Sequence, residues 1–200
     1  MPMLALSRSA APRRRHARSG ASELEAIAQP LGMNESAFWR FSLAFYSRAG
    51  VPEVCLRLQD AHALDVNVML YLLFLAANGR RIRSGDLERI EAVAAHWRET
   101  VVRPLRQVRR GLKTRPDPFE AEATEKLRND VKRIELEAER LQQLTMEQAA
   151  APATLGEPCT NPNACARHNL SLYAERLGGL ASDDVETVLQ HFTQGSAQGR

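Results

Sequence analysis

The sequence predicts an all-α protein, a helical bundle of about six or seven helices in which two long helices are charged and amphipathic. Two observations support this prediction. An apolar run occupies residues 66–77, and apolar residues recur every three or four positions along residues 84–113 and 119–150. The second spacing is typical of amphipathic helices. No segment shows the alternation of apolar and polar residues that indicates a half-buried strand.

The apolar run is the predicted centre of the fold. Every residue from Val66 to Ala77 except Asn67 is apolar, and a helix that is apolar on all sides is normally buried within a bundle. As a helix the run would measure roughly 18 Å, which is too short to cross a bilayer. We therefore expect no membrane span. Asp65 is placed to cap the start of this helix, and Asn78 with Gly79 to end it.

The chain divides into three parts by composition. The first twenty residues contain five arginines and no acid, and we expect residues 1–33 to form a disordered basic tail. Residues 34–194 are predicted to form a single helical domain, and residues 195–200 a disordered C-terminal tail. Within the domain, helices are expected at residues 35–48, 52–61, 66–77, 84–113, 119–150, 162–177 and 182–193.

The two long helices carry opposite charge. Residues 80–116 contain eleven Lys and Arg against four acids, and residues 117–149 contain nine acids against five bases. This complementarity favours an antiparallel hairpin over a nucleic-acid site. Pro104 should kink the first helix. The second helix carries a 4-3-4-3 apolar spacing, typical of a coiled-coil seam, at Leu127, Val131, Ile134, Ala138 and Leu141. The seam is equally compatible with a homodimer interface.

A polar cluster brackets the loop before the central helix, and it consists of Gln59, Asp60, Asp65 and Asn67. One interpretation is a small pocket that binds a ligand, a cation or a basic partner. The other is that these side chains cap the two helices that meet there. We favour capping, because two aspartates five residues apart across a turn have no fixed separation for acid–base chemistry.

A second group of candidates is basic. Arg103, Arg106 and Arg110 lie on one face of the predicted helix at residues 84–113, where they could bind phosphate groups or nucleic acid. The alternative is that they pair with glutamates of the next long helix. We favour pairing, because no aromatic residues alternate with the basic ones, and we do not expect nucleic acid to be the main partner.

The three cysteines are Cys55, Cys159 and Cys165. Their low, odd number and an N-terminus without an apolar signal-peptide core indicate a reducing cytoplasm. Cys159, Cys165 and His168 form a C-x5-C-x2-H pattern, which lacks the fourth ligand of a structural zinc site. We therefore expect no metal and no cofactor, and a disulfide between the two cysteines would be unusual in the cytoplasm. Whether these three residues have a role stays open.

One long block carries a resemblance to a known family. The segment FWRFSLAFYSRAGVPEVCLRLQDAHALDVNVMLYLLFLAANG and the later VVRPLRQVRRGLK and VKRIELEAERLQ resemble a family of uncharacterised bacterial proteins over residues 36–178. The resemblance implies an all-helical cytoplasmic protein. It implies no activity, substrate or catalytic residue.

The expected function follows from these features. No nucleophilic, phosphate-binding or metal-protease motif is present, so we expect a non-catalytic regulator or adaptor that binds another protein. A second hypothesis is an enzyme or small-ligand binder with a pocket near residues 59–67. A third is weak nucleic-acid binding through the basic face.

Overall fold

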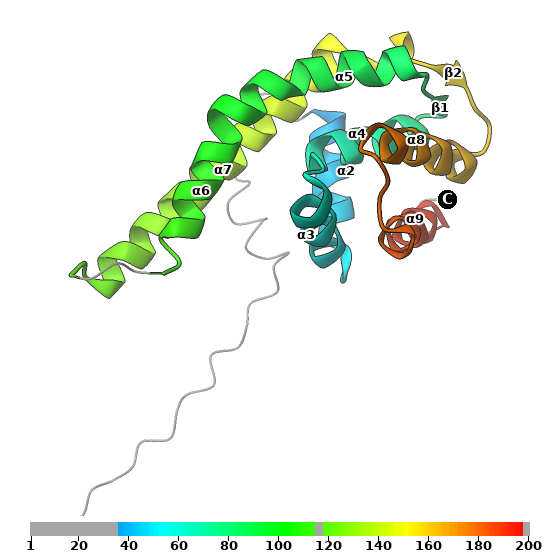
Figure 1. Ribbon diagram of the computed structural model, residues 1–200. Helices are drawn as coiled ribbons and strands as arrows, with labels where there is room; N and C mark the ends of the chain where they lie inside the picture. Colours follow the sequence, from blue (N-terminus) through cyan, green and yellow to red (C-terminus); the bar gives the residue numbers. More distant parts are fainter. Residues whose placement is uncertain (1–35, 115–117, 198–200) are drawn as a thin grey trace, which may run out of the picture. The chain divides into compact units, whose positions relative to one another are not determined.

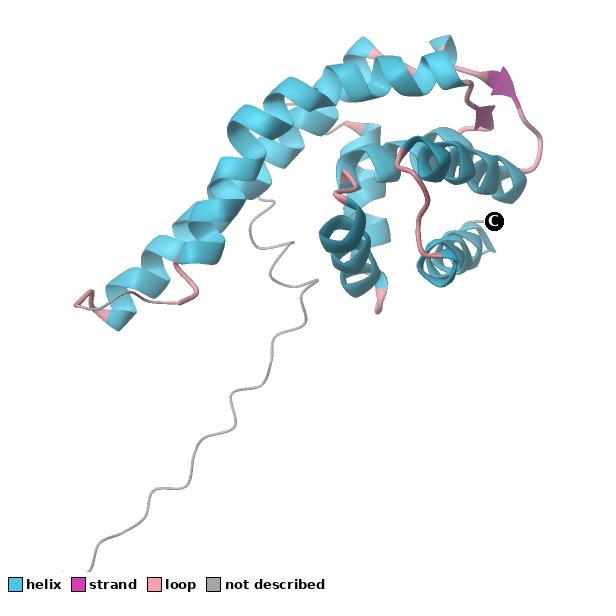
Figure 2. Cartoon of the chain, in the orientation of Figure 1, coloured by secondary structure: helices cyan, strands magenta, loops and turns pink. Residues whose placement is uncertain are grey.

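The computed structural model describes residues 36–114 and 118–197, and these residues confirm the predicted all-α bundle (Figures 1 and 2). Counting α5 and α6 as one bent helix gives seven α-helices in this part of the chain. The α-helices are α2 (Ala37–Tyr46), α3 (Val51–His62), α4 (Val66–Ala77), α5 (Ser84–Trp97), α6 (Arg103–Gly111), α7 (Ala121–Ala149), α8 (Pro162–Arg176) and α9 (Ser182–Ala197). The predicted tail at residues 1–33 lies outside the described residues.

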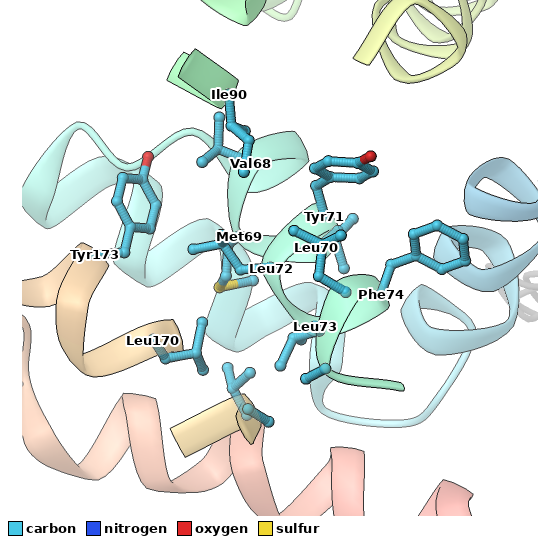
Figure 3. Packing of buried hydrophobic residues seen from close by; sticks show 14 of the residues in the cluster. Val68, Met69, Leu70, Tyr71, Leu72, Leu73, Phe74, Ile90, Leu170 and Tyr173 are labelled. Atoms are coloured by element: carbon cyan, nitrogen blue, oxygen red, sulfur yellow. The ribbon is translucent and has the colours of Figure 1, made fainter. Parts of the chain in front are cut away.

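Helix α4 is the centre of the core, as its sequence predicts. Nearly all of its side chains are buried, and Leu72 is completely so. Figure 3 shows α4 side chains pointing to several sides, with Leu170 and Tyr173 of α8 on one side and Phe74 on the other. Because burial of each large apolar side chain contributes about 1.5–3 kcal/mol, this helix supplies much of the stability. Among the described residues, no helix has both the length and the apolar composition needed to cross a membrane.

The ends of two helices differ from the expected positions. Helix α2 begins at Ala37 because the Ser36 side chain accepts a hydrogen bond from the Trp39 N–H at 2.9 Å, so the cap lies two residues after Asn34. Helix α9 continues to Ala197, three residues into the segment that we expected to be a tail. Residues 198–200 lie outside the described part of the chain.

The bend expected at Pro104 takes the form of a widened turn. A π-helical segment, η1 (Arg98–Val102), joins α5 to α6. Proline has no N–H to donate to the carbonyl four residues earlier, and here the Arg103 N–H donates to the Arg98 carbonyl, five residues earlier. π-Helical turns inside α-helices are frequent at functional sites, which draws attention to the residues around η1.

A short two-stranded sheet was not anticipated from the sequence. Strand β1 (Arg80–Arg81) pairs antiparallel with β2 (Glu157–Pro158), which follows the 3-10 turn η2 (Pro152–Thr154). Two-residue strands are too short to produce an alternating pattern, so sequence periodicity could not reveal them. Gly156, at φ +57°, lets the two backbones approach, since a Cβ at this position would lie 2.2 Å from the Arg81 carbonyl oxygen.

The two long helices form an antiparallel pair. Helix α5 and the C-terminal half of α7 pack against each other, α7 also packs on α2 and α4, and α6 packs along the N-terminal half of α7 (Figure 1). We call residues 103–114 and 118–141 the arm. Three buried residues, Val102, Val131 and Ala138, line its interior and its base but do not belong to the main core cluster. The arm is therefore a small apolar unit of its own.

Candidate functional site

Asp65 lies at the base of the arm and is buried. Its carboxylate caps α4 by accepting hydrogen bonds from the N–H groups of Asn67 (2.8 Å) and Val68 (3.3 Å), as expected. The structure adds two contacts that the sequence did not indicate. Arg98 of η1 lies 3.5 Å from the carboxylate, and the Asp65 N–H donates to the Tyr173 hydroxyl at 3.1 Å. Asp65 therefore joins α4, η1 and α8 at one point.

Asn67 is part of a buried amide network. Its side-chain NH2 donates to Gln142 at 2.6 Å, and its side-chain carbonyl accepts from Gln143 at 2.8 Å. Gln142 in turn donates to the Ala94 carbonyl at 3.2 Å. Because buried amides without partners are costly, this network fixes the position of α7 against α4 and α5.

The two remaining polar candidates bind the arm to α3. Gln59 accepts a hydrogen bond from Arg106, and Asp60 pairs with Arg110 at 3.0 Å. All four residues of the polar cluster thus make their contacts within the chain. These contacts hold helices together.

The basic candidates divide into one buried and two exposed side chains. Arg106 is mostly buried and bonds to both Glu135, at 2.9 Å, and Glu139. Arg103 is half exposed and pairs with Glu99 at 2.8 Å, one turn earlier along the chain. Together with the Asp60–Arg110 pair, these contacts neutralise the basic face with acids of the same chain.

Burial and charge shift the pKa values of the carboxyl groups beneath the arm. Burial raises the pKa of Glu139 to about 7, although the nearby Arg106 guanidinium acts in the opposite direction and the Glu135 and Asp65 carboxylates raise it further. Burial also raises the pKa of Asp65. In Glu135, hydrogen bonds from Arg109 and Arg106 outweigh burial, so its pKa is lowered. The pKa of Glu139 therefore lies near neutrality.

This shift predicts a pH-dependent stability. A carboxyl group whose pKa rises from 4.5 to about 7 on folding stabilises the fold fully below pH 4.5 and loses that contribution as pH rises through 7. Urea unfolding at a series of pH values should therefore show the unfolding free energy falling between pH 5 and 7.5. The variant Glu139→Gln should remove this fall. Glu137→Gln, on the exposed side of the same helix, should keep the fall in unfolding free energy. An equal dependence of the unfolding free energy on pH in wild type and Glu139→Gln would contradict the assignment to Glu139.

The exposed apolar side chains gather on the arm. Six large hydrophobic residues are exposed within residues 36–114 and 118–197, and five of them belong to the arm: Val108, Phe119, Leu127, Ile134 and Leu141. Ile134 is 50% exposed and Phe119 63%. Large clustered apolar side chains in contact with water are typical of binding surfaces.

The seam predicted along α7 is divided by the structure. Val131 and Ala138 are buried within the chain, whereas Leu127, Ile134 and Leu141 are exposed. The exposed three recur every seven residues and so lie on one side of the helix. The five residues therefore do not form one continuous surface, and only the exposed row is open to a second molecule.

The apolar residues of α6 lie on the same side of the arm as this row. Arg106 and Arg109 both reach Glu135, so one side of the helix pair carries the ion pairs. On α6, Leu105 and Val108 lie about a quarter turn or more around the helix from Arg106. On α7, Leu127 and Ile134 lie about a quarter turn around the helix from Glu135. Because α6 and α7 are antiparallel, the apolar row of α6 and the exposed apolar row of α7 lie on the same side of the helix pair. We call this surface the apolar face.

Trp97 extends the apolar face towards the base of the arm. Its indole N–H donates to the Ala138 carbonyl at 2.9 Å, and the ring is half buried. Ala138 lies one helical turn from Ile134 on α7, so this contact places Trp97 beside the exposed row. Tryptophans at the edge of an apolar surface are frequent binding hot spots.

A pocket of about 320 Å³ lies beside the small sheet, lined by Arg81, Ile82, Arg83, Ser84, Glu157, His168 and Leu172. Three of its polar side chains already have partners: Arg83 pairs with Glu157 at 2.6 Å, and the His168 Nε2 atom lies 3.1 Å from the Ile82 carbonyl oxygen. No group of three or more metal-ligating side chains occurs among the described residues. Within the C-x5-C-x2-H pattern, the two cysteines bond to each other.

Cys159 and Cys165 form a disulfide, which differs from the expectation of reduced cysteines. The bond joins the segment after β2 to the first turn of α8. The Cys159 N–H also donates to the Gly79 carbonyl at 2.8 Å, so the disulfide supports the contact between this segment and the end of α4. Cys55 is a free thiol buried in the core, as expected.

Reduction of this disulfide should lower the stability measurably. The bond closes a loop with a sequence separation of 6, and the loss of chain entropy for so short a loop corresponds to about 2 kcal/mol. Urea unfolding with and without dithiothreitol should show this difference in wild type. A Cys159→Ala/Cys165→Ala variant should give the same urea midpoint in both buffers. A wild-type midpoint that does not change when dithiothreitol is added would contradict the prediction.

The fold and these surfaces define an all-α protein whose polar side chains join its own helices and whose exposed apolar side chains gather on one arm. Residues 37–146 match the family described as "Protein of unknown function (DUF2390)", and the chain belongs to that family. The match is shorter than the resemblance seen in the sequence, and it includes the whole arm. No curated protein and no solved structure matches the chain.

Proposed function

We propose that this protein is a non-catalytic regulator or adaptor, and that it binds a partner protein through the apolar face of the arm. One observation supports this most strongly: the exposed large hydrophobic side chains of the described residues are concentrated on the arm. Leaving them in water has an energetic cost that binding of a partner would remove.

The two other hypotheses, a ligand pocket and nucleic-acid binding, have less support. A ligand pocket near residues 59–67 would need free polar groups, yet Gln59, Asp65 and Asn67 bond to other helices. Nucleic-acid binding would need unpaired basic side chains, and Arg103, Arg106 and Arg110 each pair with an acid. Binding of a partner protein requires neither free polar groups near residues 59–67 nor unpaired basic side chains.

Site-specific photo-crosslinking in living cells tests the proposed function. A photoreactive phenylalanine analogue is placed at Ile134, in the middle of the exposed row, or at Asn129, an exposed position on the opposite side of α7. We expect a protein adduct from position 134 and none from position 129. Absence of any protein adduct at 134 would overturn the proposal.

The cysteine count is one basis of the cytoplasmic location inferred from the sequence. The Cys159–Cys165 bond weighs against it, because disulfides seldom persist in a reducing compartment. We retain the cytoplasm as the hypothesis to be tested. Rapid alkylation of free thiols in intact cells, followed by mass spectrometry, decides the matter: alkylated Cys159 supports the cytoplasm, and a protected disulfide indicates an oxidising compartment.

A further inference from the structure

We propose that Cys159 is a site of thiol–disulfide exchange, and that its bond to Cys165 is a reversible redox switch beside the pocket at the small sheet. The reactant is a low-molecular-weight thiol of the glutathione class. This site goes beyond the proposed function and does not depend on it, because the pocket and the apolar face share no residue. Three features support it: the access to one sulfur, the anchoring of both cysteines and their position beside the pocket.

The two cysteines differ in their access to solvent. Cys165 is completely buried in the first turn of α8, whereas Cys159 is only partly buried. Thiol–disulfide exchange begins with the attack of a thiolate on a disulfide sulfur that it can reach. An external thiolate therefore attacks the Sγ atom of Cys159, and Cys165 is the leaving group.

The exchange takes place in two steps. A thiolate RS⁻ forms a bond to the Cys159 Sγ atom, the bond to Cys165 breaks, and its electron pair stays on Cys165, which takes a proton from water. A second thiolate then attacks the sulfur of the attached R group, which releases RSSR and leaves Cys159 as a thiol after protonation. The cysteine pair gains two electrons, and the two external thiols lose them. An excess of RSSR drives the reverse reaction.

Both cysteines are held in place by contacts that do not involve the disulfide. Their Cα atoms lie 6.4 Å apart. On one side, the Cys159 N–H donates to the Gly79 carbonyl at 2.8 Å, and the preceding strand β2 pairs with β1. On the other side, Asn169 anchors α8 by accepting a hydrogen bond from the Ile82 N–H at 3.0 Å. Because these bonds do not require the disulfide, the two thiols stay within the separation from which the bond forms again.

A hydrogen-bond acceptor lies beside both sulfurs. The carbonyl oxygen of Asn161 is 3.4 Å from the Cys159 Sγ atom and 3.0 Å from the Cys165 Sγ atom. A disulfide sulfur has no hydrogen to donate, but after reduction either thiol can donate to this oxygen. The same surroundings therefore accommodate the reduced pair as well as the disulfide.

The disulfide joins two sides of the pocket. Glu157, two residues before Cys159, lines one side, and His168, one helical turn after Cys165 on α8, lines another. While the bond is closed, it limits the separation of these two sides. After reduction only non-covalent contacts hold them, so residues 157–161 open locally more often.

Equilibration of the full-length protein in mixtures of reduced and oxidised glutathione tests the reversibility. Acid quenching, alkylation and peptide mass spectrometry measure the fraction of bridged chains. We expect the bond to open in an excess of reduced glutathione and to close in an excess of oxidised glutathione, with the same curve from either starting state. A bond that persists in the first case, or thiols that stay unbridged in the second, would overturn the proposal.

Two single variants test which sulfur reacts. With oxidised glutathione, Cys165→Ala should gain one glutathionyl group at Cys159, whereas Cys159→Ala should stay unmodified at Cys165. The internal control is Cys55, whose thiol should stay free in a folded chain because burial raises its pKa to about 12. Modification of Cys165 in preference to Cys159, with Cys55 unmodified, would overturn the assignment. If Cys55 reacts, the variant has lost its fold, and rapid acid quenching of wild type with reduced glutathione replaces it: the mixed disulfide must then lie on Cys159.

Hydrogen exchange of oxidised and reduced wild type tests the effect beside the pocket. The amides of residues 157–161 should exchange faster in the reduced protein, and those of α7 should exchange equally in both forms. Cys159→Ala/Cys165→Ala should give the same exchange with and without dithiothreitol. Equal exchange at residues 157–161 in the two forms of wild type would show that the bond is no switch for this part of the pocket.

Discussion

Replacing Arg106 by alanine should lower the free energy of unfolding by about 3 kcal/mol, because the change removes a largely buried counter-charge from Glu135 and Glu139. The guanidinium of Arg106 lies between α6 and α7 and contacts Gln59 of α3, Glu135 and Glu139. Glu135 is only 5% exposed. Glu135 keeps Arg109 as a partner after the substitution. The expected loss of unfolding free energy is therefore at the lower end of the range for a broken buried ion pair.

The matched control is another arginine of the same helix. Arg103 is half exposed and pairs with Glu99 in the preceding turn. Exposed ion pairs contribute between 0 and about 1 kcal/mol, so Arg103→Ala should shift the urea midpoint slightly. Similar losses in the two variants would contradict the role assigned to Arg106. Hydrogen exchange should also show faster exchange along α6 in Arg106→Ala than in Arg103→Ala.

Replacing Asn169 by alanine should have an effect of similar size, again about 3 kcal/mol. This fully buried side chain in α8 accepts a hydrogen bond from the Ile82 N–H and donates to the carbonyls of Leu72 and Arg80, at 3.0–3.1 Å. Each buried backbone group left without a partner costs about 1–3 kcal/mol. Access of water to some of these backbone groups limits the total loss of unfolding free energy.

Thermal and urea unfolding of Asn169→Ala check this expectation. The control is Asn163→Ala, near the start of the same helix, where the side chain is exposed. It should change the stability by less than about 0.5 kcal/mol. If Asn169→Ala behaved like the control, the view that Asn169 joins α4, the small sheet and α8 would be wrong.

Several features of this fold are determined by short stretches of sequence. The apolar run and its Asp65 cap fixed the start and end of α4, since every signal that defines this helix lies within 14 residues. The three- and four-residue spacing predicted α5–α6, α7 and α8 in the same way. Pro104 predicted a distortion because the missing N–H acts within a single turn. The overall fold class followed from such local signals.

The role of each polar side chain could not be deduced in this way. Whether Asp65 only caps a helix or also pairs with Arg98, and what Asn169 contacts, depends on helices far apart in the sequence. The same holds for α7, where a uniform 4-3-4-3 spacing contains both buried Val131 and Ala138 and exposed Leu127 and Ile134. The spacing places these residues on neighbouring rows, but only the position of α6 decides which row is covered.

The sequence by itself therefore determined the helices, the buried centre and the absence of a recognisable catalytic motif. The tertiary structure decided the ion pairs under the arm, the β1–β2 pairing, the disulfide and the location of the apolar face. The physical reason is the range of the interactions. Helix formation depends on hydrogen bonds and side chains within about one or two turns, whereas these other features join residues whose proximity exists only after the helices have packed.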